Sequence, residues 1–144
     1  MNKILIALVL AVVMSGNAYS EKASQKEIFD ELSYWMKGTN KLMPLQLDNL
    51  TTVNSVKYAG PNRKGEHIIT YYNQFTLNII DLGVKISSNW DFFEKGLYDQ
   101  ISMFYCTQPE MKFIKENDII AIYNYTDIDN KFVFNIGTSS KDCD

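Results

Sequence analysis

The side chains best suited to chemistry in this 144-residue chain are two cysteines, one histidine and a few carboxylates. Cys106 and Cys143 are the only cysteines, and two thiols usually pair in an oxidising compartment. They do not form a C-x-x-C motif, so we expect a structural disulfide and not a redox centre. Closing a loop of about 38 residues is worth roughly 3–4 kcal/mol of unfolding free energy through loop-closure entropy.

His67 is the only histidine. A nucleophilic triad or a zinc site needs further members, and the sequence has no G-x-S-x-G motif to supply a nucleophile. We therefore interpret His67 as a polar residue at the point where a strand leaves its loop. The alternative is a small-ligand-binding protein or small hydrolase, in which His67, tyrosines and nearby carboxylates line a cleft.

The acidic residues do not form a recognisable metal or acid–base site. Asp127 and Asp129 resemble the start of a calcium loop, but Lys131 occupies the third ligand position. Short polar residues there are typical of a hairpin turn instead. Glu94 and Asp99 lie five positions apart on an expected helix, about 140° around its axis, so they do not face one another. The sequence predicts no metal, no cofactor and no catalytic site.

The first twenty residues have the composition of a secretory signal peptide. Lys3 provides a positive start, residues 4–14 are an apolar run, and small and polar residues follow. We expect cleavage after Ser20, or alternatively after Ala18. Eleven apolar residues are too few to cross a bilayer about 30 Å thick.

Cleavage leaves a mature chain of residues 21–144, which we expect to fold as one domain. Removing Lys3 leaves 13 basic and 17 acidic residues, a net charge of −4. The mature chain has no basic stripe for nucleic acid and no polybasic segment for anionic lipid. It also has no further apolar run long enough for membrane insertion. These features predict a periplasmic or secreted protein.

Hydrophobic periodicity and capping signals predict a helix, a hairpin, two helices and a second hairpin. A capping box at Ser24 and Glu27 marks the first helix. Residues 42–49 form a connector that we expect to pack along the body of the domain, since Leu45 and Leu47 are apolar, and residues 80–87 are ambiguous. The expected elements are helix 25–37, strands 51–58 (with a bulge or a half-buried edge) and 67–78, a helix from Ser88 to about 105, a short helix from Pro109, and strands 119–125 and 131–136.

This order, α-β-β-α-α-β-β, predicts an α+β fold. Because hairpins make antiparallel pairs, we expect a four-stranded antiparallel sheet of two hairpins, covered by helices on one face and closed by one disulfide.

Tyrosines are frequent on the expected strands, at Tyr58, Tyr71, Tyr72, Tyr123 and Tyr125. If one face of the sheet is uncovered, these rings form a possible binding surface, because tyrosine combines an apolar body with a polar tip. The alternative is an ordinary packed sheet. The sequence favours a non-catalytic protein that binds another protein, in an accessory or immunity-type role. A purely structural envelope component is a further alternative.

Two stretches resemble a known group of small exported bacterial proteins. The matching segments are LMPLQLDNLTTVNSVKYAG with HIITYYNQFTL, and YCTQPEMKFIKENDIIAIYNYTDIDNKFVFNIGTSSKDC. The chain is similar there to the quorum-sensing-regulated virulence factor family, a label that describes expression and not chemistry. The resemblance implies an α+β fold, a disulfide and a periplasmic or secreted location, and it implies no active site. The residues that carry it are Pro44, Asp48, Thr51, Cys106, Tyr123, Tyr125, Asp127, Asp142 and Cys143.

Overall fold

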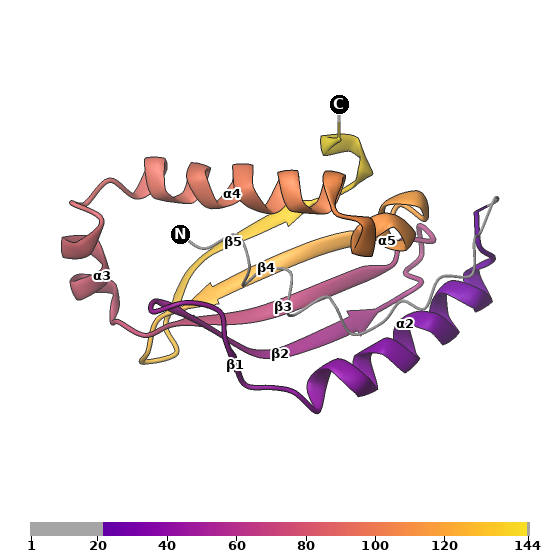
Figure 1. Ribbon diagram of the computed structural model, residues 1–144, viewed down its shortest axis with the longest axis horizontal. Helices are drawn as coiled ribbons and strands as arrows, with labels where there is room; N and C mark the ends of the chain where they lie inside the picture. The colour runs from indigo at the N-terminus through magenta and orange to yellow at the C-terminus, as the bar shows by residue number, and fades with distance from the viewer. Residues whose placement is uncertain (1–21, 144) are drawn as a thin grey trace.

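The computed structural model describes residues 22–143 (Figure 1). The signal peptide predicted over 1–20, with its cleavage sites, lies outside the described residues. The elements are α2 (Gln25–Asn40), β1 (Leu45–Gln46), β2 (Thr51–Ala59), β3 (Ile68–Phe75), α3 (Ile79–Lys85), α4 (Trp90–Thr107), the 3-10 helix η1 (Pro109–Met111), α5 (Lys112–Glu116), β4 (Ile120–Thr126), β5 (Phe132–Thr138) and the 3-10 helix η2 (Ser140–Asp142).

The strands form one five-stranded sheet in the order β1-β2-β3-β4-β5. The neighbours β3 and β4 are parallel, with Ile68 opposite Ile120, and the other three pairs are antiparallel. The fold is α+β with one disulfide, as predicted, but the predicted four-stranded antiparallel sheet and its element order are wrong.

Two short elements account for the difference in number and order. The connector contains β1, whose Leu45 pairs with Val53 of β2. A two-residue strand is too short to show a period of two in the sequence. The ambiguous segment is the helix α3, which Asn78 caps by accepting hydrogen bonds from the backbone N–H groups of Ile80 and Asp81.

The parallel pair follows from the connection between the two hairpins. Residues 76–119 carry α3, α4, η1 and α5. This connection returns the chain to the end of the sheet where β3 began, so β4 runs in the same direction as β3. A parallel pair requires a crossover of a dozen or more residues, usually helical. The predicted hairpins are correct, but the pairing between them is not antiparallel.

The helices α2 and α4 pack on the same face of the sheet, α2 against β2 and α4 against β5 (Figure 1). Alternate strand residues point into this layer. The predicted bulge in β2 is present between Val53 and Ser55, and it keeps both Val53 and Val56 buried. The largest fully buried side chains are Tyr71, Tyr105, Phe75, Leu32, Ile69, Leu82, Met111, Ile114 and Ile119.

The first helix begins as its capping box predicts. The Ser24 side chain accepts a hydrogen bond from the Glu27 backbone, and the Glu27 carboxylate accepts one from the Ser24 N–H. At its other end, Asn40 fixes α2 to the sheet. Its amide donates to the Val56 carbonyl at 2.7 Å and accepts from the Val56 N–H at 2.9 Å. The Asn40 side chain therefore occupies the position of a neighbouring strand beside Val56, which lies beyond the start of β1.

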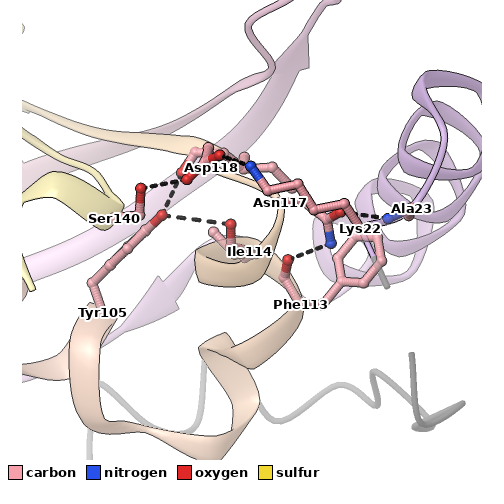
Figure 2. Close-up of polar contacts among 9 residues, drawn as sticks. Lys22, Ala23, Tyr105, Phe113, Ile114, Asn117, Asp118 and Ser140 are labelled. Atoms are coloured by element: carbon pink, nitrogen blue, oxygen red, sulfur yellow. Dashed lines mark hydrogen bonds and ion pairs between the residues drawn. The ribbon is translucent and has the colours of Figure 1, made fainter. Parts of the chain in front are cut away.

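At one end of the molecule, which we call the α5 end, a disulfide and several polar contacts join segments that are distant in the sequence. Figure 2 shows the polar contacts. Cys106 and Cys143 form the predicted disulfide, with an S–S distance of 2.00 Å. The buried Tyr105 hydroxyl donates a hydrogen bond of 2.7 Å to the Ile119 carbonyl, and burial raises the pKa of that phenol. The residues that define the α5 end are Tyr105, Cys106, Asn117, Asp118, Ser140 and Cys143.

The α5 end also holds the first described residues. Asp118 accepts a hydrogen bond from the Ser140 hydroxyl and forms an ion pair with Lys22. The Lys22 ammonium and then the Ser140 hydroxyl lower the pKa of the Asp118 carboxyl. The Ala23 N–H donates to the Asn117 side chain at 2.9 Å. Segments from both ends of the described chain therefore meet at the start of β4.

Candidate protein-binding surface

The five strand tyrosines do not form one exposed surface. Tyr71, Tyr123 and Tyr125 point into the helix-covered layer and are 2%, 7% and 5% exposed. The rings of Tyr71 and Tyr123 stack with centroids 4.6 Å apart. Burial raises the pKa of both phenols, and among residues 22–143 neither hydroxyl has a hydrogen-bond partner. These three tyrosines belong to the core.

The other two tyrosines are half-buried and lie on opposite faces. Tyr58 is opposite Ile69 on the helix-covered face, and its ring contacts Phe29 of α2. Tyr72 is opposite Ser55 on the other face, where the Lys57 ammonium lies 5.1 Å from its ring centroid. Tyr58 and Tyr72 therefore cannot belong to the same binding surface.

His67 is buried between the β2–β3 hairpin and α2, with 2% of its surface exposed. Its Nδ1 lies 2.6 Å from the Tyr58 hydroxyl, and its Nε2 lies 2.6 Å from Oε1 of Gln25. Burial lowers the pKa of the imidazole. Within residues 22–143, no carboxylate makes a hydrogen bond or ion pair with His67. The contacts give His67 a structural position that ties α2 to the hairpin.

The segment that resembles a calcium loop is the turn between β4 and β5. Asp127 is fully buried, and its Oδ1 accepts backbone hydrogen bonds of 2.9 Å from Asp129 and from Lys131. In the described part of the chain, no group of three or more histidine, cysteine or acidic residues is arranged to hold a metal ion. The interpretation of this segment as a hairpin turn is confirmed.

Exposed large apolar side chains gather at the end of the sheet opposite the α5 end. Figure 1 shows α3, the start of α4 and the β4–β5 turn at this end. Ile80, Val84 and Phe92 are 75%, 74% and 75% exposed. We call this surface the α3 end and define it by Ile79, Ile80, Val84, Phe92, Ile128 and Phe132, all of them exposed.

Asp127 holds the segments of the α3 end together. Its Oδ2 accepts a hydrogen bond of 3.1 Å from the Ile79 N–H at the start of α3. The Ile128 N–H donates to the Leu77 carbonyl at 3.2 Å. The Gln74 amide donates to the Asp127 carbonyl at 3.2 Å, which joins β3 to the turn. These hydrogen bonds, which we call the frame, fix the backbone of α3 and of the β4–β5 turn, which carry most of the exposed apolar side chains.

The ionised form of Asp127 is the one that this frame favours. Burial raises the pKa of its carboxyl, but the backbone N–H groups of Lys131, Ile79 and Asp129 outweigh that effect. The net result is a pKa below the usual aspartate value. The backbone N–H groups of the frame therefore stabilise the negative charge at Asp127.

The sequence analysis missed the α3 end, although a signal was present. Ile79 and Ile80 are adjacent at the start of the short helix α3, and Phe92 and Phe93 are adjacent in the first turn of the long helix α4. Neighbours in a helix point about 100° apart, so both members of such a pair rarely reach the same core. Phe93 packs on Phe75 and Phe134, whereas Phe92 is exposed. Doubled apolar residues at helix starts were the available indication.

Comparison with known proteins gives one informative likeness, which is a likeness of fold. The chain is similar to a crystal structure from Pseudomonas aeruginosa, described as that of a candidate secreted protein. The TM-score is 0.61 and the identity 14%, over 85% of this chain and 99% of that chain. No protein-family model and no curated protein sequence matches the chain.

The disulfide and the likeness to a candidate secreted protein are both consistent with a location outside the cytoplasm. No helix within residues 22–143 is long and apolar enough to span a membrane. None of these comparisons matches the chain to the quorum-sensing-regulated virulence factor family, so that resemblance stays a prediction.

Proposed function

We propose that this is a non-catalytic periplasmic or secreted protein that binds another protein through its α3 end. The observation that carries the proposal is the gathering of six exposed large apolar side chains at one end of the sheet, five of them on α3 and the β4–β5 hairpin, which Asp127 joins. Exposing them to water costs roughly 25 cal/mol per Å² of apolar surface, and a partner that covers them recovers that free energy.

The character of this surface supports a protein partner. Contiguous exposed apolar patches on a folded domain mark sites of interaction. Single exposed apolar residues elsewhere, such as Tyr34 of α2, need no such explanation because they are scattered. The hydrogen bonds of Asp127 hold the backbone in place, so little conformational entropy is lost on binding. An accessory or immunity-type role fits a small domain with one such surface.

Site-specific crosslinking in living cells tests the proposal. A photoreactive phenylalanine analogue replaces Ile80 in one variant and Tyr34 in a matched control, since the two side chains are 75% and 76% exposed. We expect illumination of envelope material to give one discrete adduct from position 80 and none from position 34. Adding Val84→Asp to the position 80 variant should remove that adduct without lowering the melting temperature. Equal labelling at positions 80 and 34, or no adduct at all, would refute the proposal.

A further inference from the structure

Among the strands that the structure describes, β5 lies at the edge of the sheet and pairs only with β4. In an antiparallel pair, alternate residues direct their N–H and C=O groups away from the partner strand. Within the described chain, no hydrogen bond joins the backbone of residues 132–138 to any segment other than β4. Seven residues of β5 therefore offer a free edge of about 23 Å. Such an edge is a template for one more strand.

A groove runs beside this free edge. It has a volume of about 460 Å³, and α4 forms its second wall. Figure 1 shows α4 running alongside β5. The residues that line the groove are Asp91, Glu94, Lys95 and Tyr98 from α4, and Asn135, Ile136 and Gly137 from β5. An edge strand beside a helix is a geometry in which proteins bind an extended peptide by strand addition.

The charges in the groove are unbalanced. Lys95 forms an ion pair of 2.7 Å with Asp99 one turn along α4. Asp91 and Glu94 have no ion pair or side-chain hydrogen bond in the described structure. They are three residues apart, which is about 4.5 Å along the helix axis, so one flexible cation can reach both. The groove is thus complementary to a basic side chain.

The same charges disfavour a second copy of this chain as the occupant. Two β5 edges paired with each other would bring Asp91 and Glu94 of both copies to one seam, and like charges placed together across an interface are repulsive. A foreign strand instead directs alternate side chains toward α4. Lysine or arginine at those positions meets the two carboxylates.

We propose that the groove between β5 and α4 binds an extended peptide segment by strand addition, with lysine or arginine side chains placed against Asp91 and Glu94. The residues that line this groove are not among those that define the α3 end, although the two surfaces adjoin, since β5 begins at Phe132 and Asp91 precedes Phe92 in α4. Tyr98 donates a hydrogen bond of 3.0 Å to Asp142, which fixes its ring in the groove wall. The ligand is identified by its chemistry: an unstructured, basic stretch of a polypeptide.

The first experiment measures binding of a fluorescein-labelled nine-residue peptide that alternates lysine and valine, using fluorescence anisotropy at low salt. We expect saturable binding, and about tenfold weaker binding to the double variant Asp91→Asn with Glu94→Gln, the sum of two exposed ion pairs. Glu31→Gln with Glu110→Gln removes the same charge elsewhere on exposed or half-buried helix positions, and it should change affinity less than about twofold. Absence of binding, or equal binding of a glutamate–valine peptide, overturns the proposal.

The second experiment tests strand pairing itself. Two further peptides carry N-methyl groups on alternate residues, one on the lysines and one on the valines. Only one edge of an added strand pairs with β5, so one isomer should lose binding and the other should retain it. Equal affinity for both isomers overturns the proposal, as does a dimer of the protein formed through β5. Ile80→Asp should leave peptide binding unchanged, so failure here and failure of the proposed function are distinguishable.

Discussion

The two ends of the sheet are built in opposite ways. At the α5 end, the disulfide, the buried Tyr105 hydroxyl and the ion pair of Asp118 with Lys22 join segments distant in the sequence. At the α3 end, the cross-connections are hydrogen bonds centred on Asp127, and the side chains above them are apolar and exposed. One end is closed by internal contacts, and the other has apolar surface without an internal partner.

This contrast suggests a division of roles within one small domain. The described part of the chain, residues 22–143, is short, and domains of this size have only a modest free energy of unfolding. Exposed apolar surface contributes nothing to that free energy until a partner covers it. The covalent and polar links at the α5 end compensate for this. The contrast can be tested by weakening either end and asking whether the other is affected.

Removing the disulfide should give the largest effect. We expect Cys106→Ala with Cys143→Ala to lower the free energy of unfolding by roughly 3–4 kcal/mol, because the unfolded chain regains the entropy of a closed loop. Urea unfolding measures the loss. Amides that exchange only through global unfolding should exchange faster throughout the domain. Local openings should become faster in η2 and change little in α3, and equal acceleration of local openings at both ends would contradict the division of roles.

Replacing the buried Asp127 at the α3 end should give the second largest loss of stability. Asp127→Asn leaves three backbone N–H groups facing a neutral amide and should lower stability at pH 7, as thermal unfolding will show. Because the folded pKa lies below the unfolded one, the stabilisation is complete above about pH 4 and is lost as the pH falls through the folded pKa. The wild-type and variant melting temperatures should therefore converge in acid.

Asp129→Asn is the matched control for this measurement, since Asp129 is exposed in the same turn and its side chain makes no hydrogen bond in the described structure. It should leave the melting temperature almost unchanged. Equal losses from the two substitutions would mean that net charge, and not the frame, stabilises the α3 end.

The smallest effect concerns one hydroxyl at the α5 end. Tyr105→Phe removes the donor to the Ile119 carbonyl and should cost about 1–2 kcal/mol, because a buried acceptor loses its partner. Tyr34→Phe, at a 76% exposed position, should change the unfolding free energy by less than about 0.5 kcal/mol. Chemical denaturation of both variants gives the comparison. If Tyr105→Phe leaves the unfolding free energy unchanged, the Tyr105 hydrogen bond does not stabilise the α5 end.

Local signals in the sequence predicted most of the elements. The capping box at Ser24 defined the start of α2, and alternation of apolar residues located both hairpins. The cysteine pair was also correct. The parallel pairing of β3 and β4 was not predictable in the same way, since it depends on where a connection of four helical segments returns the chain. The spacing of apolar residues within a strand does not indicate whether that strand runs parallel or antiparallel to its neighbour.

The candidate site was harder to predict for a related reason. A period of two indicates that Tyr71 and Tyr72 point to opposite faces, but it does not indicate which face the helices cover. The three tyrosines at 71, 123 and 125 lie on the covered face. The exposed apolar residues lie instead in α3, in the first turn of α4, in the β4–β5 turn and at the start of β5. The helix α3 is too short to show a clear amphipathic periodicity.

The parallel alignment of β3 with β4 also bears on the order in which the sheet assembles during folding. Each hairpin consists of neighbours in the sequence, whereas the seam between the hairpins joins residues about fifty positions apart. Contacts of such long range require more chain entropy to be lost before they form, so they slow folding. We expect the β2–β3 hairpin to form early during folding and the parallel pairing of β3 with β4 to form last.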